Sequence, residues 1–284
     1  MNSEIIILKD REILEIQGVD CKKFLQSLIT NDINKLDSSK LIYSALLNPQ
    51  GRFLYDFFIF ESEGKIFLDC QAIRAKELLR KLGFYKLKAL VEIKIAADFK
   101  VAQIIDDGKI IDSGNCHIYH DPRHEKMGLR IYSKDLNHFA TSNHLAIADS
   151  QNSYHLRRIL LKIAEGEYDL TYDKSFILEY GFNNLNAIDY KKGCYVGQEV
   201  TARTHYRGQI RKKLFHIQID SLDEISKGLE INYQQKILGT VLSSVFSEGK
   251  LNALALIKVD DEDLNLKDWQ NQLLVMENKI KIIS

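Results

Sequence analysis

The chain has 284 residues, 45% of them hydrophobic, and its 39 Lys and Arg residues balance 39 Asp and Glu residues. A chain of this size buries a sizeable core and forms one large domain or two to three smaller ones. Because the net charge is zero, no global field steers the molecule toward nucleic acid or an anionic membrane, so any site for a polyanion is a local patch.

Targeting segments and metal frameworks are not apparent in the sequence. The first residues, MNSEIIILKDREILEIQG, lack a basic leader and a small-residue cleavage site, and no later stretch reaches the roughly 18 apolar residues of a membrane span. We therefore predict a cytoplasmic protein with no membrane partner. The cysteines lie far apart without a C-x-x-C pair, which predicts reduced thiols and argues against a disulfide framework or a four-cysteine cluster site. They are Cys21, Cys70, Cys116 and Cys194.

The first half of the chain alternates between strand and helix patterns. Residues 4–8 and 12–16 read as a hairpin, and residues 18–33 continue as a helix after a possible Asp20 cap. Residues 41–47 and 52–60 flank an Asn-Pro-Gln-Gly turn and predict a second hairpin, which a strand at 65–70 extends. A helix is expected at 73–87, with Ile73, Leu78, Leu79 and Leu82 on its apolar stripe, and strands follow at 91–95 and 101–105.

The pattern of apolar residues changes toward the end of the second half of the chain. Residues 154–166 read as a helix, and a less regular region follows. From Leu214 onward, short alternating apolar runs are separated by turn residues, which predicts a small β-barrel or sandwich with a boundary near residue 215.

The stretch KKGCYVGQEVTARTHYRGQIRKK, residues 191–213, is the most informative part of the chain. Gly193 and Gly197 flank Cys194 and permit positive φ or close approach of a ligand. A helix opening at Glu199 and the neighbouring Lys192 would both favour the thiolate, so we predict a reactive or ligand-binding cysteine. The alternative is a small buried hydrophobe, the usual environment of a free cysteine.

This stretch is also densely basic. Seven Lys and Arg residues stand against Glu199 alone, which is enough to hold a carboxylate tail or a few phosphates. A solvated basic face is the alternative. The overall composition argues against a dedicated RNA binder, because the remaining chain cancels the charge and no aromatic pair is spaced for base stacking.

The motif KGCYVGQE, followed by AR and YRG, resembles the signature of the YgfZ family of folate-binding proteins, which are relatives of the glycine-cleavage T protein and of a mitochondrial iron–sulfur assembly factor. The likeness extends to the GVDCKKFLQSLITNDI, GRFLYDFFIF and YHDPRHEKMGLR segments, although Ile177 stands where relatives often carry proline. The resemblance implies an α+β fold: a T-protein-like folate-binding domain of two interleaved α+β subdomains at 1–215, and a small C-terminal β-barrel at 216–284. It also implies a central cavity for tetrahydrofolate with Cys194 near its rim.

Glu179 is the expected pterin ligand. A pterin offers an adjacent ring N–H and amino group that one carboxylate accepts in bidentate fashion, and Glu179 sits among apolar residues where an unpaired carboxylate is costly. The alternative is a structural ion pair with Arg203. By resemblance, the other cofactor-binding residues are Asn31, Tyr180, Lys192, Tyr195, Gln198, Glu199, Arg203 and Arg207.

Asp56 is the second conspicuous acid. Alternation along RFLYDFFIF puts it on the same strand face as Leu54, Phe58 and Phe60. By resemblance it matches the aspartate that the T-protein branch uses near the reactive folate nitrogen, where a carboxylate steers protonation or stabilises positive charge. A solvent-facing strand would make it unremarkable.

Cys116, His117, His120 and His124 are candidate metal ligands, because histidines four apart on a helix share a face. Pro122 interrupts a continuous helix, and the D-P-R segment suggests instead an internal Asp121–Arg123 ion pair. We predict no metal ligands.

The resemblance implies a tetrahydrofolate-binding accessory factor for the assembly or repair of iron–sulfur clusters in client enzymes, including tRNA-modifying ones. Expected partners are folate and iron–sulfur client or assembly proteins. With four dispersed cysteines the chain cannot hold a whole cluster, so Cys194 provides at most one ligand, a redox contact or a transient covalent link. The alternative function is a folate-dependent aminomethyl or one-carbon transferase.

Overall fold

The computed structural model describes residues 4–105, 112–220, 225–233, 236–259, 273–276 and 278–283. The chain forms two compact units. The first comprises residues 1–151 and 183–198, and the second comprises residues 152–182 and 199–284. The chain therefore crosses between the units more than once, and the single boundary near residue 215 stays a prediction about domains.

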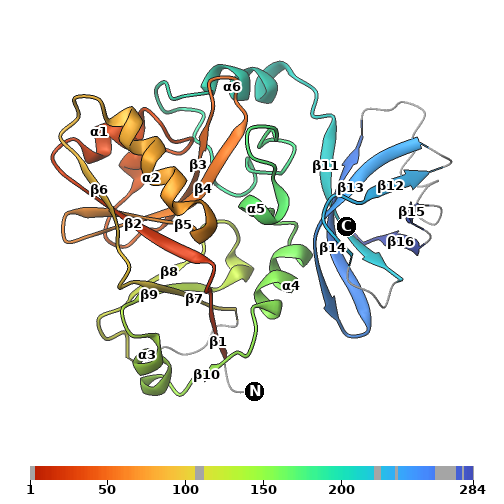
Figure 1. Cartoon of the computed structure of the whole chain (residues 1–284), viewed down its shortest axis with the longest axis horizontal. Helices are drawn as coiled ribbons and strands as arrows, with labels where there is room; N and C mark the ends of the chain where they lie inside the picture. The colour runs from red at the N-terminus through yellow and green to blue at the C-terminus, as the bar shows by residue number, and fades with distance from the viewer. Residues whose placement is uncertain are drawn as a thin grey trace. The chain divides into compact units, whose positions relative to one another are not determined.

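The first unit contains two five-stranded sheets (Figure 1). Across the first sheet the strands run β3 (Ile42–Leu47), β4 (Phe53–Ser62), β5 (Lys65–Gln71), β2 (Arg11–Gln17) and β6 (Glu92–Ile95). Across the second sheet they run β10 (Ala146–Ile147), β1 (Glu4–Ile7), β7 (Lys100–Ile104), β9 (Leu129–Ser133) and β8 (His117–His120). The predicted hairpin of β3 and β4 is confirmed, with Ala45 opposite Asp56 in an antiparallel register.

The predicted hairpin of the first two strands is wrong. Both strands form, but β1 pairs with β7 and β10 while β2 pairs with β5 and β6, so consecutive strands enter different sheets. The central residues of β2, from Ile13 to Ile16, are all buried. Burial of a strand on both faces favours a central position in a sheet rather than the edge position of an isolated hairpin.

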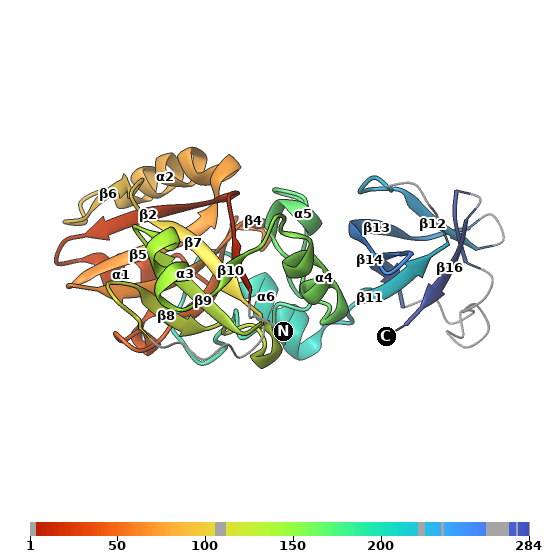
Figure 2. The ribbon, with the colours of Figure 1, turned by 90° about the horizontal axis from the view of Figure 1, so that it is seen from below.

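Helices of the first unit flank these sheets. They are α1 (Cys21–Gln26), α2 (Ala72–Lys86), α3 (Leu136–Ser142) and the short 3-10 turns η1 (Ile33–Lys35) and η2 (Glu125–Met127). Helix α2 packs against β2, β5 and β6 (Figure 2) through Ala75, Leu78 and Leu82. The predicted stripe is wrong at Ile73, which is exposed at the first turn.

Charged residues occupy the interior between the two sheets. Asp69 on β5 accepts from Arg11 on β2, with Nε 2.7 Å from Oδ1, and from Arg130 on β9, with Nε 2.7 Å from Oδ2. The ring of Phe58 lies beneath the Arg130 guanidinium, 4.0 Å from its centroid. Tyr132 completes this group, because its hydroxyl donates to Asp69 Oδ2 at 3.0 Å. A carboxylate with two buried cations is the arrangement that makes burial of charge tolerable.

The second unit contains the helices α4 (Asn152–Leu160) and α5 (Gly166–Asp169), most of α6 (Gln198–Arg207) and a closed barrel. Asp169 links the helical part to the barrel, accepting from Arg158 Nη1 at 2.6 Å and from Ser243 Oγ at 2.6 Å. The barrel core is aliphatic, with Ile217, Val241 and Ile257 fully buried.

The barrel confirms the predicted C-terminal β-barrel. Its strands are β11 (Lys212–Ile219), β14 (Lys250–Lys258), β13 (Lys236–Ser247), β12 (Glu230–Tyr233), β15 (Leu274–Val275) and β16 (Asn278–Ile282), and β16 closes on β11. The chain thus combines sheets and helices with a C-terminal barrel, as the predicted α+β fold requires. Within the described residues, no helix has the length and apolarity that crossing a membrane requires.

Candidate functional site

Cys194 lies on a loop that is fixed at both ends but open at its centre. Lys192 and Tyr195 are buried, whereas Gly193 and Cys194 are exposed. The backbone N–H of Val196 donates to the carbonyl oxygen of Ser27 at 3.3 Å, which ties the loop to the end of α1. The alternative of a buried hydrophobic cysteine is therefore excluded, and the thiol stands at the surface of a constrained loop.

Lys192 turns inward from this loop. Its Nζ donates to the carbonyl oxygens of Ile29 and Asn31, each at 2.7 Å, and lies 5.1 Å from the ring centroid of Tyr195. Burial lowers the pKa of Lys192 to about 8, although the nearby carboxylates of Asp32 and Asp189 act in the opposite direction. The side chain thus anchors the cysteine loop to the Thr-Asn-Asp segment.

Gly197 serves packing rather than access. Its φ is +83°, and a Cβ placed there would lie 2.6 Å from the carbonyl oxygen of Asn48. The close approach allowed by this glycine is to the turn between β3 and β4, not to open space. Gly193 differs, because a Cβ there would meet no atom within 4 Å.

Helix α6 begins at Gln198, which confirms the expected helix after the cysteine motif. The N–H of Gln198 donates to the carbonyl oxygen of Tyr195 at 3.1 Å, so the helix follows the loop without a break. Glu199, Arg203 and Arg207 are exposed on this helix. Arg203 and Arg207 thus face solvent, where they are available to an anionic group.

Asn31 occupies a buried position with its amide already engaged. Its Nδ2 donates to the carbonyl oxygens of Tyr43 at 2.8 Å and Asn186 at 2.7 Å. Lys35 Nζ lies 3.2 Å from its Oδ1. The amide side chain of Asn31 therefore connects three parts of the chain: β3, the 3-10 turn η1 and the segment that follows Phe182. These contacts fix the segment on which the cysteine loop packs.

Asp56 is buried on β4 with 3% of its surface exposed. Tyr43 on β3 donates its hydroxyl to Asp56 Oδ2 at 2.5 Å. Strict alternation predicts one buried face, but β4 is buried on both faces from Phe53 to Phe60. The carboxylate is therefore held in a protein interior by a short hydrogen bond, and the solvent-facing alternative is excluded.

Glu179 and Tyr180 belong to the second unit, in the turns after α5. Glu179 is half-buried beside the buried residues Leu178 and Tyr180, and its N–H donates to the carbonyl oxygen of Phe176 at 3.0 Å. The Tyr180 hydroxyl lies 3.2 Å from Ser175 Oγ. Burial raises the pKa of Tyr180, so this hydroxyl is protonated at neutral pH. The assignments of Glu179 to a pterin or to Arg203 both stay predictions.

The predicted Asp121–Arg123 ion pair is confirmed. Arg123 Nη2 lies 2.7 Å from Asp121 Oδ2, both side chains are fully buried, and the guanidinium lies 4.7 Å from the centroid of Phe58. His117 and His120 bound strand β8 rather than sharing a helix face. Among the described residues, no group of three or more His, Cys, Asp and Glu side chains is placed to hold a metal ion.

Sequence reasoning missed the charged group at Asp69. Two of its members interrupt apolar strand patterns, Asp69 in KIFLDC and Arg130 in GLRIYS, whereas Arg11 stands at the start of REILEI. A charged residue within such a run was the signal that identified Asp56, and the same signal would have found Asp69. The pairing itself could not be foreseen, because Asp69 and Arg130 are 61 residues apart.

The remaining thiols differ from Cys194 in burial. Cys21 and Cys70 are buried and Cys116 is half-buried. Burial raises the pKa of all three, that of Cys70 to about 12. Of the four cysteines in the chain, only Cys194 is exposed.

Comparison with known proteins defines the class of this chain. No family model matches the sequence. The fold is that of the glycine cleavage T protein: the crystal structure of the glycine cleavage system aminomethyltransferase T from Bartonella henselae superimposes with a TM-score of 0.74 at 12% identity, covering 100% of this chain and 85% of that chain.

Curated relatives point to iron–sulfur cluster assembly factors. The iron–sulfur cluster assembly factor IBA57 homolog of Neurospora crassa is 33% identical in an alignment of 229 positions that covers 73% of this chain and 52% of that protein. The mouse assembly factor IBA57 is 29% identical in an alignment of 236 positions that covers 75% of this chain and 65% of that protein. The recognition from sequence is thus confirmed: the chain is similar to the IBA57 iron–sulfur cluster assembly factors and has the T-protein fold. It spans about half the length of the Neurospora relative.

The predicted cytoplasmic location is contradicted by these relatives, which are named mitochondrial proteins in Neurospora, mouse and human. The prediction rested on the lack of a leader pattern in the first residues. A targeting segment lies outside the folded domain and is removed after import, so the residues that build this fold carry no information about the compartment.

Proposed function

We propose that this chain is an accessory factor in the assembly or repair of iron–sulfur clusters, that it binds tetrahydrofolate, and that Cys194 is its reactive thiol. The observation that carries the proposal is the exposure of Cys194 on a loop fixed by Lys192, Tyr195 and Gly197. The curated relatives named as iron–sulfur cluster assembly factors support the first part.

The distribution of thiols favours an accessory role over a scaffold. A four-iron cluster requires about four thiolate ligands, and here three of the four cysteines are withdrawn by burial that raises their pKa. One exposed thiol offers a single ligand to a cluster in transit or one partner in thiol exchange. The cluster is therefore the cargo of a client or assembly partner, and this chain contributes a contact to it.

The donor types present suit a reduced folate. Glu179 has the apolar surroundings that a pterin ring requires beside its carboxylate ligand, and Arg203 and Arg207 are exposed cations suited to a glutamate tail. A bound tetrahydrofolate would supply a reduced pterin and nitrogens that carry one-carbon groups. Lys192 and Asn31 contribute to the proposal by holding the cysteine loop, because their donors already bind backbone carbonyls.

Calorimetric titration with tetrahydrofolate tests the ligand. Wild-type protein should release or absorb heat with saturation, and Glu179→Gln should weaken binding by about tenfold to a hundredfold, because a charge-assisted bidentate bond is replaced by a poorer one. Glu230→Gln, which changes an exposed glutamate of β12, is the matched control and should bind as wild type does. Absence of heat in the wild type would refute folate binding.

A folate-dependent aminomethyl or one-carbon transferase is the second candidate. It is favoured by the buried Asp56, whose carboxylate is oriented by the Tyr43 hydroxyl, and by the fold shared with an aminomethyltransferase. If the transferase activity exists, formation of methylenetetrahydrofolate should collapse in Asp56→Asn while folate binding persists. If the protein binds folate but catalyses no transfer, the transferase function is refuted and only the accessory role is left.

The most specific part of the proposal concerns which client enzymes this factor serves. The family resemblance implies clients that include tRNA-modifying iron–sulfur enzymes. Direct RNA contact through residues 191–213 would instead give tRNA binding that weakens steeply with salt and is reduced in Arg207→Ala and Lys212→Ala. A flat response to salt would remove that alternative.

A further inference from the structure

Four apolar side chains extend into solvent where the turn between β2 and α1 meets the C-terminal end of α2 and the loop that follows it. Val19, Phe84, Leu87 and Leu90 are between 68% and 88% exposed. Scattered apolar residues on a surface are ordinary, but a contiguous group marks an interaction site. These four residues come from two segments that the fold holds together.

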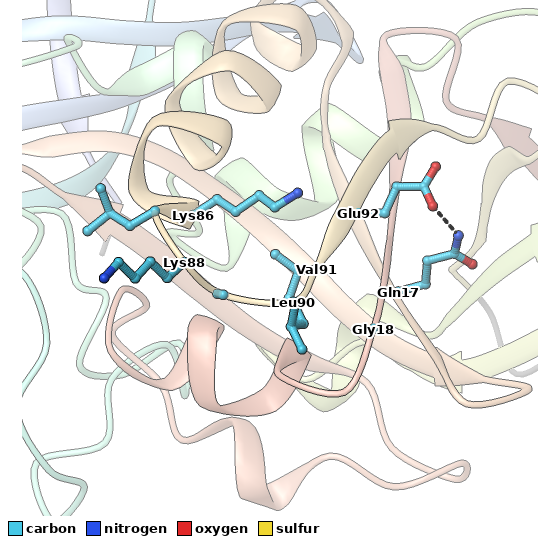
Figure 3. A pocket seen from close by; sticks show the side chains of 9 residues that line it. Gln17, Gly18, Lys86, Lys88, Leu90, Val91 and Glu92 are labelled. Atoms are coloured by element: carbon cyan, nitrogen blue, oxygen red, sulfur yellow. Dashed lines mark hydrogen bonds between the residues drawn. The ribbon is translucent and has the colours of Figure 1, made fainter.

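The two segments are fixed by a close backbone contact. Gly18 has a φ of +127°, and a Cβ at this position would lie 2.1 Å from the carbonyl oxygen of Leu90. Asp20 reinforces the contact, because its Oδ2 accepts from the N–H of Leu90 at 2.8 Å. Figure 3 shows the shallow hollow at this junction, lined by Gln17, Gly18 and residues 86–92. The apolar side chains are therefore presented by a defined surface.

Cations lie on the same segment as three of the four apolar residues. Residues 72–95 contain seven Lys and Arg residues and two Glu residues, a net charge of 7 − 2 = +5 in a chain whose total is zero. Both acids are engaged: Glu77 pairs with Arg74 at 2.6 Å, and Glu92 accepts from Gln17 Nε2 at 2.6 Å. In Figure 3, Lys88 extends away from the Glu92 and Gln17 pair, whereas Lys86 extends toward the side on which Glu92 lies.

We propose that this basic-apolar patch, consisting of Val19, Phe84, Lys86, Leu87, Lys88 and Leu90, binds the surface of an anionic lipid membrane. The apolar side chains enter the boundary between head groups and acyl chains, and the lysine ammonium groups remain among the anionic head groups. Neither contribution alone anchors a protein firmly, and the patch supplies both.

Two other occupants fit the composition less well. Interfaces between proteins are depleted in lysine, whereas both cations of the patch are lysines. Single-stranded RNA is held by stacking on aromatic or arginine side chains, and three of the four apolar residues here are aliphatic. Protruding aliphatic side chains beside lysines are the combination that a lipid surface accepts.

This inference is independent of the proposed function and departs from the expectation that no membrane is a partner. That expectation rested on the lack of a spanning segment, and binding at a membrane surface requires none.

Sedimentation with vesicles tests the inference on the full chain. Wild-type protein should sediment with vesicles of phosphatidylcholine mixed with phosphatidylglycerol, less so at high salt, and should remain in solution with phosphatidylcholine alone. Lys86→Gln combined with Lys88→Gln should weaken binding by about tenfold or more, since each lysine near such a surface contributes about 1 kcal/mol, and about 1.4 kcal/mol is a factor of ten.

The double variant Leu87→Asn with Leu90→Ser tests the contribution of the apolar side chains to vesicle binding. Leu87 and Leu90 are 88% and 68% exposed, so their replacement removes no packed side chain and this variant should fold. It should also lose about tenfold or more in affinity for the mixed vesicles. Met276→Ser and Lys250→Gln are matched controls on exposed barrel residues and should bind as wild type does. Wild-type protein that ignores anionic vesicles, or patch variants that bind them unchanged, would overturn the proposal.

Discussion

Lys192 donates its ammonium to the carbonyl oxygen of Ile29 at 2.7 Å, across 163 residues of sequence. A second bond of equal length reaches Asn31. The lysine next but one to the exposed cysteine therefore fixes the segment on which the cysteine loop rests, and a residue that the sequence suggested as a cation for folate is an internal anchor.

Lys192→Met should lower the free energy of unfolding by about 2–4 kcal/mol, because two buried carbonyl groups lose a charged donor while the aliphatic stem is kept. Lys191→Met changes an exposed neighbour and should leave the value almost unchanged. Chemical denaturation followed by circular dichroism measures both. Equal stability of the two variants would show that the bonds to Ile29 and Asn31 contribute nothing.

The same lysine predicts a pH dependence of stability. Burial lowers its pKa to about 8 in the folded chain, against 10.5 for a free lysine. Between these values the unfolded chain binds more protons than the folded chain, so the contribution of Lys192 to the free energy of unfolding rises as pH rises. The difference in unfolding free energy between wild type and Lys192→Met should therefore increase from neutral pH toward pH 10. A difference that falls over this range would contradict the assignment.

The two glycines of the cysteine motif should respond oppositely to substitution. Gly197→Ala forces a side chain into a left-handed backbone and against Asn48, and should cost about 1–3 kcal/mol. Gly193→Ala enters open space and should change stability by less than about 0.5 kcal/mol. Thermal unfolding distinguishes them. If the alanine at 193 were the more harmful one, the description of this loop would be wrong.

Thiol labelling should find one reactive cysteine. Near neutral pH, iodoacetamide should modify Cys194 much faster than the other three, because burial raises the pKa of Cys21, Cys70 and Cys116 and shields them. Cys194→Ser should remove the fast phase, whereas Cys116→Ser should retain it. Mass spectrometry identifies the modified residue. Comparable rates at two or more cysteines in folded protein would contradict the exposure pattern.

Local patterns predicted much of the fold. The turn Asn48-Pro49-Gln50-Gly51 set the β3–β4 hairpin, and the alternating runs after Leu214 indicated the barrel. The local pattern did not predict which strands pair, because pairing depends on contacts between distant parts of the chain. The consecutive strands β1 and β2, for example, enter two different sheets. Ile73 matched the helical period, yet its position at the first turn of α2 leaves it in solvent.

The candidate site was predictable by residue type more than by role. An acid within an apolar strand marked Asp56, and a cysteine between glycines marked Cys194. The burial of the Lys192 side chain was not predictable. Its acceptors are backbone carbonyl oxygens, which every residue has, so no residue type in the sequence indicates them. The same holds for Gly197, whose contact is with the backbone of a distant turn.

Complementation in cells that lack this protein tests the central claim most directly. Activities of iron–sulfur enzymes, normalised to an enzyme without a cluster, should be restored by wild type and by Cys116→Ser but not by Cys194→Ser at equal protein levels. Restoration by Cys194→Ser equal to that by wild type would contradict the proposal that the exposed thiol serves iron–sulfur cluster assembly.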